Sequence, residues 1–264
     1  MTTVKTVFDY LETLAPAYMK EDWDNVGLLC GRWEKPVERI LVALDPFRNV
    51  IDEAIERKAD LIVTHHPLIF RSGPMAVTED SEVGRNLLTL IENGIAAINA
   101  HTNLDCAPGG INDILAETLG LGEITVMDPT GTDALGRPYG LLRCGIVVEQ
   151  SLDTFLATVK SNLHCEGLRY VDGGKPVRKV AVGGGACAGG MYDVLKAGCD
   201  TFVTSDIRYN QFWEAKEQGL NLIDAGHFHT ENPAMPILAA KLQATFPKIE
   251  VIISKNHEDC MKFY

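Results

Sequence analysis

The sequence carries the same order of secondary-structure signals twice, and this repetition limits the fold more than any other feature. Each copy reads strand, helix, strand, helix, strand. The first copy covers residues 39–45, 50–59, 60–66, 83–94 and 95–101, and the second covers 178–185, 191–198, 199–206, 210–219 and 220–227. β-branched apolar runs that alternate with amphipathic helices are typical of a parallel, doubly wound sheet. The sequence therefore predicts an α/β protein.

Residue identities support a duplication of this pattern. Residues 59–64 (ADLIVT) align with residues 199–204 (CDTFVT), and the helix end at 92–94 (ENG) aligns with 217–219 (EQG). We predict two duplicated α/β repeats, the first over residues 1–122 and the second over 123–264, with an approximate boundary.

Segments outside the repeated pattern add a loop and a further strand. Residues 67–84 are rich in Gly and Pro and predict a loop over the carboxyl ends of the strands. Residues 127–140 read as a linker or loop. Residues 141–149 predict an additional strand of the second sheet, followed by an amphipathic helix at 151–163.

Composition excludes several classes of protein. The net charge of −12 over 264 residues argues against nonspecific binding to nucleic acid or anionic membranes. The opening residues lack the apolar core of a signal peptide, and no window approaches 18 consecutive apolar residues. The seven cysteines are scattered without CxxC spacing, which fits reduced thiols. We therefore expect a cytoplasmic protein that binds neither membranes nor nucleic acid.

Imidazoles and carboxylates gather at the predicted strand ends of both repeats. The first repeat offers His65 and His66 after its second strand and the segment 101–105 (HTNLD) after its third. The second repeat offers 205–206 (SD) and 226–231 (GHFHTE) at the equivalent positions. Ligands of open α/β sheets bind beyond the carboxyl ends of the strands, where side chains from successive strands meet. The clusters together predict a metal site.

The spacing of these residues suits more than one metal ion. His101 and Asp105 are four residues apart, as are His227 and Glu231, so each pair fits one helical turn or one tight loop. Adjacent residues in a regular strand point to opposite faces, although at a strand end followed by Pro67 both side chains could reach forward. We expect the pair at 65–66 to serve two ions, one each. Imidazole and carboxylate ligands admit zinc, iron, manganese, nickel or cobalt, and a carboxylate can bridge two ions.

Plainer interpretations and other chemistries remain open at this point. The histidine pair could be hydrogen-bonded or solvated, and Asp45 and Asp60 could be cap or turn residues. A serine hydrolase is disfavoured because Ser205 lies in TSD and no GxSxG turn is present. Cys106 is either a nucleophile or a small incidental thiol. Residues 182–190 (VGGGACAGG) form either an anion-binding turn or a simple tight turn.

Four separated stretches then suggest a family. They are 22–31 (DWDNVGLLCG), 63–70 (VTHHPLIF), 99–105 (NAHTNLD) and 224–231 (DAGHFHTE). In residues and order they resemble a family of hexameric proteins with a dinuclear metal centre, the NGG-interacting-factor-like family. Its bacterial members are labelled GTP cyclohydrolase I type 2 homologues. The resemblance covers nearly the whole chain. It implies two intertwined α/β repeats with mostly parallel mixed sheets, a toroidal homohexamer and two divalent metal ions per subunit.

The resemblance also implies roles for individual residues. The implied metal ligands are His65, His66, Asp105, His227 and Glu231. Glu231 is also the expected bridge and a catalytic residue, and His101 is expected to be catalytic, either as a ligand or just behind the ligands. Independently of the resemblance, His229 lies two residues from His227 and is expected either to stand just behind the ligands or to face the substrate, and Asp206 is a further candidate for substrate contact. The chain departs from the family pattern at two positions, because Ser205 replaces a glycine and Asn210 stands where a histidine is expected.

The resulting hypothesis is a metal-dependent hydrolase. The implied reaction is hydrolytic opening of the GTP imidazole ring with release of formate, for which metal ions would activate a water molecule. Two alternatives have the same ligands: a hydrolase of other nucleotides or phosphoesters, and a metal-handling or regulatory protein without turnover. Ligand count does not separate them.

Overall fold

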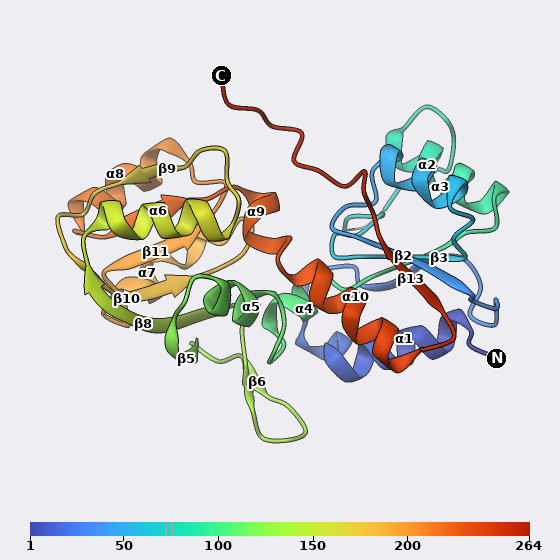
Figure 1. The fold of residues 1–264 in the computed structure, drawn as a ribbon, viewed down its shortest axis with the longest axis horizontal. Coiled ribbons are helices and arrows are strands. Elements are labelled where there is room, and N and C mark those ends of the chain that lie inside the picture. Colours follow the sequence, from blue (N-terminus) through green and yellow to red (C-terminus); the bar gives the residue numbers. More distant parts are fainter. Residues whose placement is uncertain (72, 75) are drawn as a thin grey trace. The chain divides into compact units, whose positions relative to one another are not determined.

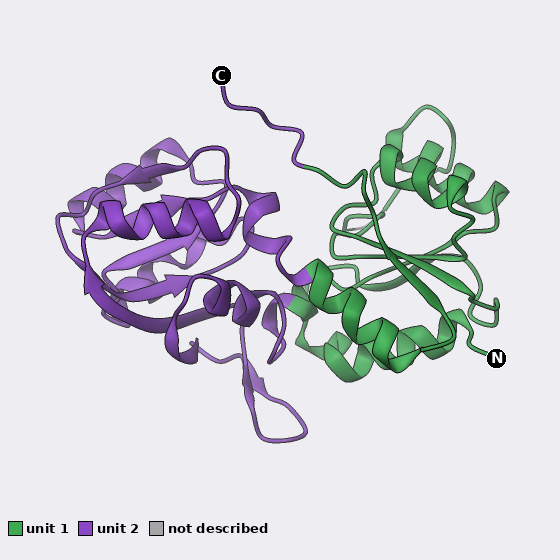
Figure 2. Cartoon of the chain, in the orientation of Figure 1, with its two compact units in different colours: residues 1–104, 235–258 green, residues 105–234, 259–264 purple. Residues whose placement is uncertain are grey.

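The computed structural model describes residues 1–71, 73–74 and 76–264, and these form two compact units. The first unit comprises residues 1–104 and 235–258, and the second comprises 105–234 and 259–264, as Figure 2 shows in green and purple. The chain therefore leaves the first unit, builds most of the second and returns. The units are defined by contacts, whereas the predicted repeats 1–122 and 123–264 are defined by sequence, and that boundary stays a prediction.

The first unit contains a five-stranded sheet in the order β1-β4-β3-β2-β13. Its strands are β1 (Gly27–Cys30), β2 (Arg39–Ala43), β3 (Leu61–Thr64), β4 (Ala96–Asn99) and β13 (Glu250–Ile253). The strands β13, β2, β3 and β4 are parallel, and β1 pairs antiparallel with β4. This unit therefore has the predicted parallel core with one antiparallel strand at its edge.

Helices cover both faces of this sheet (Figure 1). They are α1 (Val4–Leu14), the 3₁₀ turn η1 (Ala17–Met19), α2 (Arg48–Glu56), α3 (Glu82–Glu92), α4 (Thr102–Cys106), which ends in the second unit, and α10 (Ala234–Thr245). Ile51 of α2 and Leu90 of α3 pack with Leu41 and Ile62 in one buried cluster. Burial of such side chains stabilises the fold by about 1.5 to 3 kcal/mol each. The α1 and α10 segments meet where the Tyr10 hydroxyl donates to the Lys241 carbonyl.

The second unit contains a six-stranded mixed sheet in the order β5-β8-β10-β11-β12-β9. Its strands are β5 (Gly122–Met127), β8 (Leu142–Gln150), β9 (Arg169–Val171), β10 (Val177–Val182), β11 (Thr201–Thr204) and β12 (Asn221–Asp224). The strands β10, β11 and β12 are parallel, and the other three pair antiparallel. The strand predicted at 141–149 is β8, which joins the second sheet by pairing with β10.

Alternating side chains of this sheet divide between two buried clusters. Val182 and Val203 pack with Phe155 on one face, whereas Ala181 and Phe202 pack on the other. The helices are α5 (Ile111–Thr118), α6 (Leu152–Asn162), the 3₁₀ turn η2 (Ala188–Gly190), α7 (Met191–Lys196), α8 (Tyr209–Glu217) and α9 (His227–Glu231). A small hairpin of β6 (Gly131–Thr132) and β7 (Pro138–Tyr139) occupies the predicted linker at 127–140. The period of two along each strand therefore builds a core on both faces.

The duplication extends to individual hydrogen bonds. The Asp60 carboxylate accepts from the amides of Glu38 (2.8 Å) and Arg39 (3.1 Å) at the start of β2. The Asp200 carboxylate likewise accepts from the amides of Arg178 (3.1 Å) and Lys179 (2.7 Å) at the start of β10. Asp60 and Asp200 thus hold two parallel strands together in the same way. The repeated ADLIVT and CDTFVT segments are structurally equivalent.

The predicted loop at 67–84 lies between β3 and α3, although residues 72 and 75 fall outside the described part of the chain. Its last residues form the start of α3, where the Ser81 hydroxyl accepts from the Gly84 amide at 3.0 Å. At the other end of α3, Gly94 adopts a left-handed φ of 65°, which confirms the predicted glycine at the helix end. Within the described residues, no helix has both the length and the apolar character that crossing a bilayer requires.

Candidate metal centre

Three histidines of the first unit converge beyond the carboxyl ends of β3 and β4. β3 ends at Thr64, so His65 and His66 both lie past the last residue of the strand, and His101 follows β4. The ring centroids lie 4.9 to 5.5 Å apart. Each residue offers one ligand nitrogen, and the three nitrogens lie within 4.8 Å of one another. We call these residues the histidine cluster.

The chain turns sharply at the histidine pair, and this brings the two neighbouring rings together. The Thr64 hydroxyl donates to the His66 carbonyl at 2.7 Å, and the His66 amide donates to the Leu44 carbonyl at 2.9 Å. A continued strand would have sent the two side chains to opposite faces. Because the strand stops first, His65 is buried and His66 is half-buried on the same side.

Each imidazole of the histidine cluster is oriented through its Nδ1 atom. Nδ1 of His65 lies 2.9 Å from the Ala100 carbonyl, Nδ1 of His66 lies 2.6 Å from Asp45, and Nδ1 of His101 lies 2.8 Å from Asp24. An Nδ1 that faces a carbonyl or carboxylate carries the proton, which leaves Nε2 as the basic atom that binds a metal. The three rings therefore share the tautomer that metal-binding histidines adopt.

Asp24 is the most strongly anchored acid around this cluster. It is buried, and it accepts from the Thr102 amide at 3.0 Å and from the Thr102 hydroxyl at 2.5 Å, in addition to His101. Burial raises the pKa of Asp24, but the hydrogen bonds from His101 and Thr102 outweigh it and lower the pKa to about 2. Asp24 is therefore a carboxylate that fixes His101.

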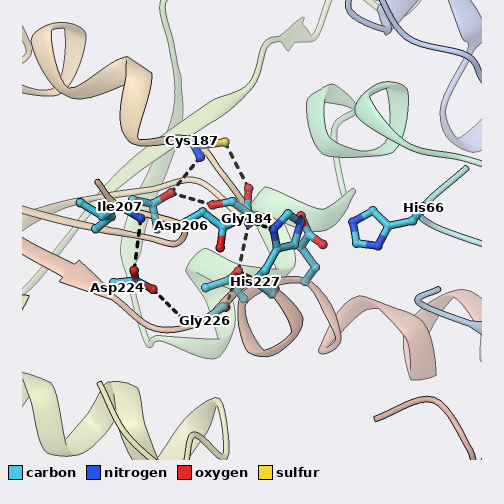
Figure 3. A network of polar contacts seen from close by, with 12 residues as sticks. His66, Gly184, Cys187, Asp206, Ile207, Asp224, Gly226 and His227 are labelled. Atoms are coloured by element: carbon cyan, nitrogen blue, oxygen red, sulfur yellow. Dashed lines mark hydrogen bonds and ion pairs between the residues drawn. The ribbon is translucent and has the colours of Figure 1, made fainter. Parts of the chain in front are cut away.

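A second cluster lies in the second unit, where α9 carries a histidine and a carboxylate one turn apart. His227 Nε2 lies 3.2 Å from Glu231 Oε1, and Glu231 is buried. On the other side of the ring, Nδ1 of His227 lies 2.7 Å from Asp206 (Figure 3). His227 is thus oriented by a carboxylate just as His66 and His101 are. The Asp206 backbone has a left-handed φ of 53°.

The glycine-rich turn after β10 packs directly against this second cluster. The Gly184 amide donates to Asn112 at 2.6 Å, and the Gly185 amide donates to the Thr230 hydroxyl at 3.0 Å. A Cβ atom added at Gly185 would lie 2.8 Å from His227 Nε2 and closer still to the Glu231 carboxylate. These contacts give the turn a structural role, because its glycines leave room for the two side chains.

Asp105 is a buried residue of the second unit, at the end of α4. The segment after it is held by Arg143, whose buried guanidinium donates to the carbonyls of Cys106 and Ala107 at 3.1 Å each. Arg143 also pairs with Asp113 at 2.5 Å. Removal of one partner of such a buried pair costs about 3 to 5 kcal/mol. The backbone at Asp105 is therefore rigidly placed.

The remaining predicted site residues have other contacts. His229 Nδ1 lies 3.2 Å from the Leu163 carbonyl, and its Nε2 lies 3.4 Å from Asp259. Asn210 is exposed on α8, and its side chain donates to Glu214 at 2.9 Å. Cys106 is buried. The carboxylate of Asp224, which precedes the motif at 226–231, accepts from the Ile207 and Gly226 amides at 3.2 and 3.1 Å (Figure 3).

Sequence reasoning missed the two carboxylates that orient the histidine cluster. In the sequence, Asp45 has the pattern of a cap or turn residue, and Asp24 stands out only as part of the stretch 22–31. Both bind histidine Nδ1 atoms instead. The available signal was the place of Asp45 just past the end of β2, the strand that pairs with β3, which the histidine pair follows.

The donor sets fit divalent metal ions. Imidazole nitrogens and carboxylate oxygens are borderline to hard ligands, and the orienting acids at Asp24, Asp45 and Asp206 are the partners that metal-bound histidines require. The described residues thus include groups able to bind metal.

Comparisons with known proteins agree with this description. The family described as Duf34/NIF3 (NGG1p interacting factor 3) matches residues 2–260. A "GTP cyclohydrolase 1 type 2 homolog" of Clostridium perfringens is 37% identical over 262 residues, covering 97% of this chain and 98% of that protein. The crystal structure of Staphylococcus aureus hypothetical protein SA1388 superposes with a TM-score of 0.92 at 30% identity, covering 99% of each chain. A Bacillus cereus protein related to NIF3 gives a TM-score of 0.93 at 26% identity, covering 100% of each chain.

Proposed function

Since this chain belongs to the Duf34/NIF3 family, we propose that it is a metal-dependent hydrolase with a dinuclear centre. The observation that carries the proposal is the histidine cluster, in which three oriented imidazoles bring their ligand nitrogens within 4.8 Å. The ligands implied by the resemblance are His65, His66, Asp105, His227 and Glu231, and their assembly into one centre rests on that resemblance. Ions bound there would supply Lewis-acid activation of a water molecule and of the bond under attack.

The protein's own groups supply orientation and charge in this proposal. Asp45 and Asp206 hold His66 and His227 in the tautomer that presents Nε2. Asp24 holds His101 in the same tautomer, so that its Nε2 is the third ligand nitrogen of the histidine cluster. The buried Glu231 carboxylate contributes a negative charge that holds cations.

The proposed reaction is hydrolytic opening of the GTP imidazole ring with release of formate. Its support is the name shared by curated relatives, among them the Clostridium perfringens protein. We further propose that the protein acts in the cytoplasm as a homohexamer, on the same resemblance. Light scattering coupled to size-exclusion chromatography checks the assembly, and a mass of one or two chains would exclude a hexamer.

The experiment that tests the proposal combines metal analysis with an activity assay. Protein purified with zinc, iron, manganese, nickel or cobalt is analysed for metal content and incubated with GTP and a panel of phosphoesters. We expect at least about one metal ion per chain, with formate release from GTP. His65→Ala should lose both properties, whereas His164→Asn, a control at an exposed histidine with left-handed φ, should keep them.

The outcomes separate the competing hypotheses. Metal binding with turnover of a phosphoester but not of GTP would support a hydrolase whose substrate is not GTP. Full metal occupancy with no turnover of any substrate would favour the alternative, a metal-handling or regulatory protein. A metal content well below one ion per chain after reconstitution would remove the premise of both.

A further inference from the structure

Two large aromatic side chains and one arginine form an exposed group at the rim of the histidine cluster. Trp23 and Phe70 are 46% and 51% exposed, with ring centroids 5.6 Å apart and planes inclined by 62°. The Arg71 guanidinium carbon lies 5.6 Å from the Trp23 centroid and 5.2 Å from the Phe70 centroid. We call these three residues the aromatic rim.

The aromatic rim lies directly beside the proposed site. The Trp23 ring centroid is 6.1 Å from that of His101, and the Phe70 centroid is 6.2 Å from it. The segments that carry the two rings are joined, because the side-chain Nδ2 of Asn25 donates to the Ile69 carbonyl at 2.8 Å. Asp24, the neighbour of Trp23, is anchored to Thr102. The two rings are therefore held at the edge of the histidine cluster by fixed backbone.

Packing of the protein core does not account for this arrangement. A single exposed aromatic ring is common on protein surfaces. Here two rings leave about half of their surface in water, and a guanidinium lies within the range of cation–π attraction of both. The exposed parts of the two rings offer aromatic surface for a planar ligand, and the guanidinium offers a fork of donors that matches a phosphate or carboxylate. The group thus combines an apolar planar surface with a cation.

We infer that the aromatic rim binds a nucleotide, with the base stacked on Trp23 and in edge-to-face contact with Phe70, and with a phosphate paired with Arg71. The inference rests on the proposed function insofar as this nucleotide is the substrate. In a chain with a net charge of −12, a local cation is needed to attract a polyanion. Stacking on aromatic rings tolerates any base, so the rim selects nucleotides as a class. The planar ring would then lie beside His101.

The test uses Trp23 as a fluorescence reporter in protein from which a chelator has removed metal. Binding is then measured without turnover. The chain has three tryptophans, and the variant Trp33→Phe/Trp213→Phe keeps Trp23 alone. GTP, guanosine and tripolyphosphate are the probes. We expect GTP and guanosine to quench Trp23 fluorescence and tripolyphosphate to leave it unchanged. GTP should bind more tightly than guanosine, and Arg71→Gln should reduce GTP to the affinity of guanosine.

Calorimetry on single variants measures the contribution of each ring. Trp23→Ala and Phe70→Ala should each weaken GTP binding about tenfold, and Trp23→Phe should restore most of it. The matched control is Trp213→Ala, since Trp213 is 51% exposed and has Lys216 5.5 Å from its ring centroid, but lies on α8 in the second unit. Equal GTP affinity in Trp23→Ala and Trp213→Ala would overturn the inference, as would GTP that fails to bind at millimolar concentration.

Metal analysis of the same variants separates this inference from the proposed function. If the chain binds nucleotide through Trp23 but never retains metal, the inference stands and the proposal of a metal-dependent hydrolase is refuted. A metal-loaded chain that hydrolyses a substrate equally well with Trp23→Ala, and in which Trp23→Ala binds GTP as tightly as Trp213→Ala does, would overturn the inference and leave the hydrolase standing.

Discussion

Asp24 Oδ1 lies 2.8 Å from His101 Nδ1, while the other oxygen of the same carboxylate binds Thr102. One buried acid therefore orients an imidazole and fixes the first residue of α4. Both functions require a negative charge at this position, because each oxygen accepts from an N–H or O–H group.

We expect Asp24→Asn to lower metal affinity by about 10- to 100-fold, as loss of the acid behind a metal-binding histidine does elsewhere. The amide nitrogen would also face the Thr102 donors, which should cost about 1 to 3 kcal/mol of stability. Competition with a chromophoric chelator measures the affinity, and urea denaturation measures the stability. Asp22→Asn, two residues away and exposed, is the control. Equal metal affinity in the two variants would contradict the orienting role.

Asp206 should act on His227 in the same way, without a role in folding. Its side chain is 50% exposed, and asparagine tolerates the left-handed φ of 53°. We expect Asp206→Asn to reduce metal affinity about tenfold with an unchanged melting temperature. Asp128→Asn is a matched control, since Asp128 is also exposed and has a φ of 43°. The role of Asp206 would be refuted by metal affinity that matches the control.

Gly185→Ala tests the close packing of the glycine-rich turn. The new methyl group would collide with His227 and Glu231, and the φ of 63° adds strain. We expect a loss of about 2 to 4 kcal/mol together with weaker metal binding. Gly198→Ala has a similar φ of 73° with nothing within 4 Å of the new Cβ, so it should lose only about 1 kcal/mol. Equal losses in the two variants would show that backbone strain alone matters.

Glu53 predicts acid sensitivity of the first unit. This buried carboxylate accepts from the Ser254 hydroxyl at 2.6 Å and from the amides of Lys255 and Asn256. Burial raises the pKa of Glu53, but these hydrogen bonds, with a smaller contribution from Arg57, outweigh it and hold the pKa below its ordinary value of 4.5. The folded state therefore binds this proton less readily than the unfolded chain does. The stabilisation is complete above pH 4.5 and is lost as the pH falls below it.

We expect Glu53→Gln to cost about 2 kcal/mol at pH 7, and the difference from the native chain to shrink as the pH is lowered below 4.5. Denaturation curves at several pH values measure this. Glu56 is exposed and lies about one helical turn after Glu53 on α2, so Glu56→Gln should show no pH-dependent loss of stability. A Glu53→Gln penalty that stays constant down to pH 3 would argue against the charge as its cause.

The sequence was sufficient to predict the elements that depend on local pattern. The two copies of strand and helix signals were found because their apolar periodicity is visible in short windows. The strands β1 and β13 were not predicted, because each is short and its pairing depends on residues far away in sequence. Contacts between distant segments are set by tertiary packing, which a pattern does not report.

The same limit applies to the candidate site. The histidines were identified because they follow recognisable strands. The acids behind them were not, because Asp24 reaches His101 and Asp45 reaches His66 only after the sheet has formed. The end of β3 at Thr64 also matters here, since it decides that His65 and His66 lie on the same side. A strand end is the least certain feature of a sequence-based prediction.

The return of the chain to the first unit has a consequence for biosynthesis. β13 (Glu250–Ile253) pairs with β2, and it emerges from the ribosome only after residues 105–234 have been made. Until then β2 is an edge strand with unpaired backbone groups on one side, which is a template for wrong pairing with another chain. The sheet of the first unit is therefore incomplete until the last part of the sequence has been synthesised. A chain released before residue 253 would expose the edge of β2.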